Sequence, residues 1–140
     1  MEITINYWAV FVVALINMII GFIWYGPLFG KLWKELMGFT EETMKEMKMS
    51  PIGAMIGGFI GAFIMAYILK HFVVSSGAFW NVGGAFAGVT VAFWIWFGFI
   101  APVTAGSFLW EGKPFKIWVL NSSYWLVTLI FMGAILGIWA

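Results

Sequence analysis

The sequence predicts an all-α fold: an integral membrane four-helix bundle with a short amphipathic cytoplasmic segment between its first and second long helices. Hydrophobic residues make up 64% of the 140 residues and charged residues 9%, whereas a soluble domain carries about 25% charged residues. Four segments without any charge are each about 20 residues long, enough to cross ~30 Å of hydrocarbon as helices. These spans, expected within one transmembrane domain over residues 1–140, are residues 7–25, 52–69, 82–101 and 117–139.

The first span is expected to stay in the mature protein. It follows Glu2 rather than a basic stretch, and it runs into Trp24, Tyr25 and a Gly-Pro pair instead of a small-residue cleavage pattern. Amphipathic rings are favoured at the headgroups and proline interrupts a helix, so this stretch is interpreted as the end of the span. A ligand-binding turn is the alternative interpretation.

The polar stretch that follows predicts a short helix at the membrane surface. Thr40 is its candidate N-cap, Glu41 and Glu42 suit its first turn, and Lys45 and Lys48 suit its last. We interpret the region as an interfacial segment, with a partner-docking surface as the alternative. The residues assigned to the cytoplasmic interface are Trp24, Trp33, Lys31 and Lys34.

The second span begins at a proline, where the missing N–H is harmless, and carries the strongest packing signal. Small residues four apart let helix backbones approach closely, either within one chain or between chains. We therefore expect close helix contacts and a homo-oligomer. The glycines in such patterns are Gly53, Gly57 and Gly61 on the second span, Gly84 and Gly88 on the third, and Gly133 and Gly137 on the fourth.

The third span is expected over residues 82–101, because the uncharged stretch 72–110 is too long for one crossing. Glycines loosen the start of that stretch and Pro102 its end. Residues 102–110 then return along the interface or form a re-entrant loop, which would need protein around its backbone.

Lysine placement predicts the orientation of the four spans. Six lysines lie in the loops after the first and third spans, and only Lys70, next to His71, lies between the second and third. Lysine-rich short loops stay in the cytoplasm. We therefore expect a multi-pass protein of the cell membrane, in contact with the lipid bilayer, with both termini outside.

Neutral polar residues within the spans form a candidate intramembrane lining, and no ionisable group is expected there. Burying an amide without a partner is costly, so these side chains should point inward. They either bond helix to helix or line a narrow path for a small neutral or weakly polar solute. Asn17 is expected to bond to Thr128, Asn121 or Thr90, with Thr128 at the better depth. The full set is Asn17, Tyr25, Thr90, Asn121, Tyr124 and Thr128.

Catalytic chemistry is sparse in this composition. The chain has no Cys, Asp, Arg or Gln and only one histidine, so thiolate and His-based metal sites, His-carboxylate catalysis and arginine phosphate clamps are unavailable. We expect no enzyme activity, no cofactor, no metal and no nucleic-acid partner. Glu111 with Lys113, and the acidic residues of the first loop, are the remaining acid-base groups.

Several segments resemble the bacterial and archaeal membrane family known as domain of unknown function 1761. The resemblance covers nearly the whole chain and implies a small four-span membrane protein. Because that family has no assigned reaction, the resemblance implies no catalytic residue, but it adds weight to a functional role for the first turn. The matching stretches are Gly21, Trp24-Tyr25-Gly26-Pro27, Phe29-Gly30-Lys31, Trp33, residues 65–69 and Trp110-Glu111-Gly112-Lys113-Pro114.

Two function classes follow from the sequence. The first is a protein that binds or passes a small neutral or weakly polar solute along the polar lining. The second is a structural or interaction protein that oligomerises through its glycine faces and docks partners or anionic lipid on its lysine-rich loop. A continuous water-accessible path past the polar residues would favour the first class, and a dry, closed bundle would favour the second.

Overall fold

The computed structural model describes residues 3–47 and 49–139, so Lys48, expected in the last turn of the short polar helix, lies outside them. Within these two ranges the chain forms helices and connecting turns without a strand, which confirms the all-α prediction. In chain order the elements are α1 (Tyr7–Ile23), the π-helical turn η1 (Trp24–Leu28), α2 (Gly30–Met37), α3 (Glu41–Lys45), α4 (Pro51–Trp80), α5 (Gly84–Ile95), the π-helical turn η2 (Trp96–Ile100), α6 (Ala101–Thr104), α7 (Gly106–Leu109) and α8 (Phe115–Ile138).

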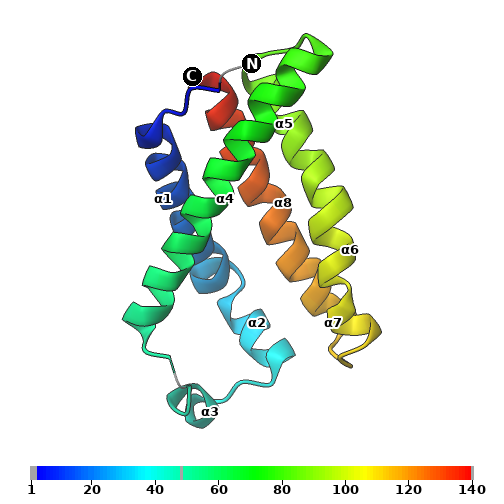
Figure 1. Ribbon diagram of the computed structural model, residues 1–140. Coiled ribbons are helices and arrows are strands. Elements are labelled where there is room, and N and C mark those ends of the chain that lie inside the picture. The colour runs from blue at the N-terminus through cyan, green and yellow to red at the C-terminus, as the bar shows by residue number, and fades with distance from the viewer. Residues whose placement is uncertain (1–2, 48, 140) are drawn as a thin grey trace.

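Four helical stretches are long and apolar enough to cross a membrane, as predicted. The start of α1 and the end of α8 lie at the same end of the molecule as the turn between α4 and α5, whereas α2, α3 and α7 lie at the opposite end (Figure 1). We call that opposite end the lysine-rich end, because it carries the loops after the first and third spans. The four stretches are Tyr7–Leu28, Pro51–Trp80, Gly84–Leu109 and Phe115–Ile138.

The short polar helix α3 and the start of α4 follow the predicted capping chemistry. The Thr40 side chain accepts a hydrogen bond from the Thr43 backbone N–H at 3.2 Å, and the Thr43 side chain accepts one from the Thr40 N–H at 2.7 Å. Pro51 occupies the first turn of α4, where Ser50 accepts a hydrogen bond from the Gly53 N–H at 3.0 Å. Local sequence therefore sets both helix starts.

The second span is longer than predicted. It was expected to end at Leu69, but α4 continues through Lys70 and His71 to Trp80, a helix of 30 residues and about 45 Å. It stops at Asn81, whose left-handed backbone (φ 54°) forms the C-cap. A lysine and a histidine do not break a helix, and no proline lies between Pro51 and Asn81.

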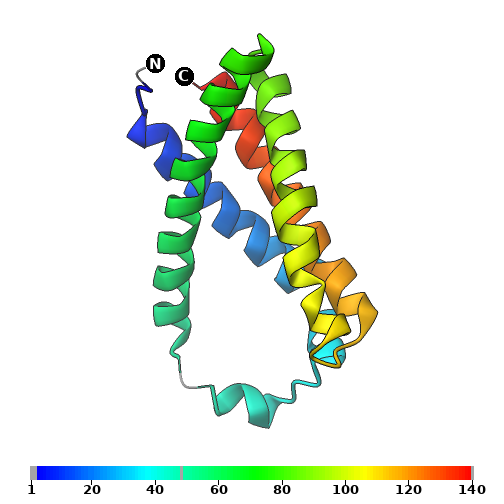
Figure 2. The same cartoon turned by 45° about the vertical axis from the view of Figure 1, so that its right-hand side comes forward.

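The apolar core lies where α1, α4, α5 and α8 meet, toward the end that carries both termini. There α4 and α5 lie side by side, whereas the first turns of α4 stand apart from α6 and α8 (Figure 2). The buried residues of α4 accordingly begin only at Ala62. The buried core side chains are Ala9, Val10, Val13, Ala66, Leu69, Val73, Val91, Ala92, Leu129, Met132 and Leu136.

Glycines bring α5 and α8 into direct backbone contact. A Cβ placed on Gly88 would fall on the carbonyl of Gly133, and a Cβ placed on Gly137 would fall on the carbonyl of Gly84. These two predicted glycine faces therefore meet each other inside one chain, and their missing side chains are what allows the approach.

The glycine face of α4 is not used in this way. Around Gly57 and Gly61 the described part of the chain places no atom within 4 Å of an added Cβ, and Gly53 meets only the neighbouring Met49 and Ser50 side chains. No close helix contact is therefore made by this face within the chain. A contact between chains stays a prediction.

Candidate functional site

The first π-helical turn, η1, explains how the chain tolerates Pro27. Proline removes one N–H and its ring collides with the carbonyl four residues earlier, and a wider turn relieves both problems. The Phe29 N–H bonds to the Trp24 carbonyl five residues back at 2.9 Å. A Cβ on Gly30 would lie 2.7 Å from the Tyr25 carbonyl oxygen, so this position needs glycine. The helix therefore continues past the predicted break at Gly26-Pro27, and η1 carries Tyr25.

Four of the six predicted lining residues form one cluster between α1, η1 and α8. The Tyr25 hydroxyl donates to Asn121 Oδ1 at 2.7 Å, and the Tyr124 hydroxyl donates to Asn17 Oδ1 at 3.3 Å. The two tyrosine rings meet edge to face with centroids 5.1 Å apart. Gly21 leaves room for this arrangement, because a Cβ there would lie 3.0 Å from the Tyr124 hydroxyl oxygen.

Asn17 points inward and is buried, but its predicted partner was wrong. It bonds to Tyr124 and, through Nδ2, to the Met132 sulfur at 3.5 Å. The expected partner Thr128 is fully buried, and its hydroxyl has no hydrogen-bond partner among the described residues. Depth along the helix axis favoured Thr128, but the longer tyrosine side chain reaches Asn17 from one turn away.

Thr90 does not join the cluster. Its hydroxyl donates to the Phe86 carbonyl of its own helix at 2.7 Å. A threonine in a helix can satisfy its hydroxyl in this way without any tertiary partner. The Thr90 hydroxyl therefore bonds only within α5 among the described contacts. The third helical stretch contributes other residues to the site, which are described below.

A cavity of about 800 Å³ lies at the lysine-rich end, beside the Tyr25–Asn121 pair. This volume is within the range of small-molecule sites. Tyr124 is only 7% exposed and lies at the deep side, whereas Trp110, 88% exposed, lies with exposed Glu111 at the mouth. The lining residues are Tyr25, Trp33, Val103, Thr104, Gly106, Ser107, Trp110, Glu111, Trp118, Asn121, Tyr124 and Trp125.

The third helical stretch continues past its predicted end at Ala101 and through Pro102 to Leu109, and its last two short helices, α6 and α7, form one side of the cavity. The second π-helical turn, η2, and then α6 and α7 lead the chain past α8, and the Trp118 indole N–H bonds to the Ala101 carbonyl at 3.0 Å. Residues 102–110 are thus mostly helical and rest against α8. Ser107 contributes a buried hydroxyl without a hydrogen-bond partner in the described part of the chain.

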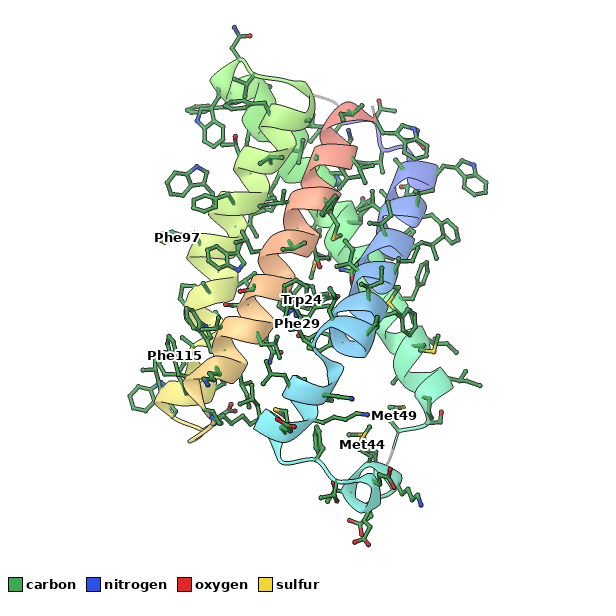
Figure 3. All side chains as sticks on the ribbon, turned by 180° about the vertical axis from the view of Figure 1, so that it is seen from behind. Trp24, Phe29, Met44, Met49, Phe97 and Phe115 are labelled. Carbon is green, nitrogen blue, oxygen red and sulfur yellow. The ribbon has the colours of Figure 1, made fainter. Side chains whose placement is uncertain are left out.

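The predicted interface residues divide into two groups. Lys31 and Lys34 are exposed. Trp24 packs against Phe29 beside α8 (Figure 3), with ring centroids 4.8 Å apart, and its indole nitrogen is buried. Trp33 lines the cavity and meets Tyr25 edge to face at 5.8 Å. The two tryptophans therefore face protein at this end.

Sequence reasoning missed most of the aromatic lining. Trp118, Asn121 and Trp125 are spaced three and four residues apart on α8 and lie on one face, which is a signal that the sequence does contain. Trp110 and Ser107 carried no signal, because only the fold of α6 and α7 brings them to α8.

Lys70 corrects the prediction that no span contains an ionisable side chain. It is 5% exposed, and its ammonium donates to the carbonyl oxygens of Leu136 at 2.8 Å and Trp139 at 3.2 Å. These carbonyls belong to the C-terminal end of α8, where the helix dipole favours a cation. Lys70 joins α4 to α8 at the end opposite the cavity.

His71, the only histidine in the chain, stays on its own helix. Its Nδ1 lies 2.9 Å from the Tyr67 carbonyl oxygen, and its ring meets the Tyr67 ring at 4.7 Å. Across residues 3–47 and 49–139, no three His, Cys, Asp or Glu side chains gather in a group that could hold a metal ion.

Comparison with known proteins adds one match. Residues 8–137 match a family model described as a protein of unknown function, DUF1761. No match was found among curated proteins or among solved structures.

Proposed function

The chain belongs to the DUF1761 family of proteins of unknown function, and we propose that it binds a small neutral or weakly polar solute in the cavity at its lysine-rich end. The observation that carries the proposal is the cavity of about 800 Å³ closed on its deep side by the Tyr25–Asn121 hydrogen bond and by Tyr124. Sites for small molecules combine an apolar or aromatic wall with a few placed polar groups.

The polar groups at the deep side suit a solute of low charge. Tyr25 and Tyr124 both donate their hydroxyl protons to asparagine oxygens, so the two rings are held in place by hydrogen bonds. The Asn121 amide nitrogen is the remaining donor of that pair. Threonine, serine and amide groups can orient a weakly polar molecule, whereas the indoles supply contact area.

Binding, rather than a chemical reaction, is the activity proposed. Glu111 is the single carboxylate among the lining residues, and no lysine or histidine lines the cavity with it. General acid-base catalysis needs such groups within hydrogen-bond reach of one another or of the substrate. Passage of the solute would need a second state, since Leu129, Met132 and Leu136 fill the bundle beyond Tyr124.

The proposal is tested by filling the cavity. Gly106 lines it, and a Cβ there would meet the Trp110 ring at 3.7 Å, an ordinary contact, so Gly106→Leu adds bulk to the cavity without a backbone collision. Gly98→Leu is the matched control: an added Cβ meets nothing within 4 Å in the described chain, and Gly98 is exposed on the same span.

The measurement is unfolding of the detergent-solubilised protein with and without a panel of short alcohols, small amides and indole. A ligand that binds only the folded protein stabilises it by about 2.7 kcal/mol at 100 times its Kd. We expect this gain in the wild type and in Gly98→Leu and its loss in Gly106→Leu. A panel in which Gly106→Leu responds as strongly as the wild type would refute the cavity as the binding site.

A second function is favoured by the open face of α4. A Cβ added to Gly57 or Gly61 would have no atom of the described chain within 4 Å. The exposed side chains of Ile56, Ile60 and Ile64 flank these two glycines. Such a face is suited to backbone contact with a second copy. Homo-oligomerisation through α4, with the exposed lysines docking partners or anionic lipid, is therefore the alternative role.

A further inference from the structure

We propose that this cavity takes organic cations of the quaternary ammonium class, with aromatic faces around the cation and Glu111 at the mouth as its counter-charge. The inference rests on the proposed solute site and extends it: beside neutral and weakly polar solutes, the cavity takes monovalent cations whose charge is covered by alkyl groups.

The first observation is the share of aromatic side chains. Six of the twelve lining residues are aromatic, and four of these are tryptophans: Tyr25, Trp33, Trp110, Trp118, Tyr124 and Trp125. The faces of aromatic rings carry negative electrostatic potential and attract cations, most strongly for tryptophan. Several such rings around one space form the kind of cage that recognises alkylated ammonium groups.

The second observation is the sign of the charge. Glu111 is the one lining residue with a formal charge, although six of the seven lysines lie in the loops after the first and third spans. Lys31, Lys34, Lys113 and Lys116 are exposed and none of them lines the cavity. An anion would thus meet a carboxylate and ring faces, whereas a cation meets complementary charge.

The third observation separates quaternary from primary ammonium groups. A primary ammonium needs hydrogen-bond acceptors for three N–H donors. At the deep side, Asn121 Oδ1 already accepts from the Tyr25 hydroxyl at 2.7 Å, so the three N–H donors would depend on lining hydroxyls and on the exposed Glu111 carboxylate at the mouth. A quaternary ammonium has no N–H group and presents only alkyl surface, which the indole faces cover without an unmet hydrogen bond.

The test compares three probes, of which choline and neohexyl alcohol match in size and ethanolamine is smaller, on the full chain in nanodiscs of phosphatidylglycerol. Choline carries the quaternary nitrogen, neohexyl alcohol has a quaternary carbon in its place, and ethanolamine carries a primary ammonium. Binding is followed by calorimetry and by tryptophan fluorescence. We expect choline to bind about tenfold or more tightly than either of the other two, a ratio consistent with a few cation–ring contacts.

Two variants assign that preference to the cavity. Glu111→Gln and Trp110→Leu should each weaken choline binding about threefold to tenfold and leave the affinity for neohexyl alcohol nearly unchanged. Trp110 is 88% exposed, so its loss removes little packing. The controls are Glu35→Gln, an exposed acid on α2, and Trp8→Leu, 73% exposed near the N-terminus, neither of which lines the cavity.

A repeat in nanodiscs of phosphatidylcholine distinguishes a free cation from a lipid headgroup. Weaker choline binding in phosphatidylcholine would show that the lipid headgroup, which carries the same trimethylammonium group, competes for the cavity. Equal choline binding in the two lipids would show that the ligand is a free solute. Both results support the cation class.

Equal affinity for choline and neohexyl alcohol, or variants no weaker than their controls, would overturn the cation inference and leave the solute site standing. If choline, its two analogues and the alcohol and amide panel all fail to bind, the inference and the proposed function fall together.

Discussion

Replacing Gly88 by alanine should destabilise the protein by adding one methyl group at its closest helix contact. An ideal Cβ on Gly88 would fall on the Gly133 carbonyl of α8 and lie 3.0 Å from the Ala134 nitrogen. These are backbone atoms, and they cannot move aside as the end of a flexible side chain can. The variant can form only if α5 and α8 separate at this point.

Two terms set the magnitude of the effect. Alanine within a helix is favoured over glycine by about 1 kcal/mol, and overpacking a close contact costs about 1–3 kcal/mol. Gly57→Ala is the matched control, because an added Cβ there meets nothing within 4 Å in the described chain, so it carries the first term alone. The free energy of unfolding of Gly88→Ala should therefore lie about 1–3 kcal/mol below that of Gly57→Ala.

The assay is reversible unfolding in maltoside micelles by sodium dodecyl sulfate, followed by circular dichroism at two protein concentrations. Equal free energies of unfolding for the two variants would refute the backbone contact between α5 and α8. A loss of stability in Gly57→Ala, relative to the wild type, that shrinks as the protein is diluted would instead reveal a contact between copies at α4.

Four further outcomes are expected. Asn17→Leu removes the acceptor of the Tyr124 hydroxyl and should lower the free energy of unfolding by about 1 kcal/mol; unchanged stability in the same micelle assay would show that this bond contributes nothing. Lys70→Met removes two hydrogen bonds to the last carbonyls of α8 and should speed amide hydrogen exchange in its last turn, with Lys70→Arg restoring protection; equal exchange in all three proteins would argue against the cap. Single cysteines placed in this cysteine-free chain test orientation: an impermeant reagent should label position 78 but not position 45 in intact cells, and the reverse pattern would mean that both termini lie inside. Gly57→Ile should reduce the size of any oligomer in detergent, measured by light scattering, because the branched side chain holds backbones apart; an unchanged size rules out this face as the contact.

The four long apolar helices could be predicted from the sequence, because each corresponds to a charge-free segment of about 20 residues. Helix ends were less predictable. Lys70 and His71 suggested the end of the second span, but the carbonyls that accept from the Lys70 ammonium lie 66 and 69 residues away in α8. The charge of Lys70 in α4 is stabilised by backbone carbonyls at the end of α8. Such a contact between distant segments cannot be inferred from the order of residues along the chain.

Glycine spacing predicted where backbones can approach but not which backbones do. The same four-residue repeat occurs at Gly84 and Gly88, which meet α8, and at Gly57 and Gly61, which meet nothing within the described chain. The polar cluster was predictable as a set of inward faces, and the Tyr25–Asn121 bond joins two of its members. The Tyr124–Asn17 bond was not, since counting residues along the axis ignores how far a tyrosine hydroxyl extends.

The hydrogen bonds from Lys70 also have a consequence in time. Lys70 of α4 is synthesised before the carbonyl groups that accept its hydrogen bonds, because Leu136 follows it by 66 residues. The delay is roughly 3–13 s at ribosomal rates of about 5–20 residues per second. During that interval the ammonium lacks the helix end that later holds it, and a chain cut short before Leu136 never acquires it. A Lys70 ammonium without its two carbonyl acceptors thus marks the incomplete chain, and it gains them only when α8 docks.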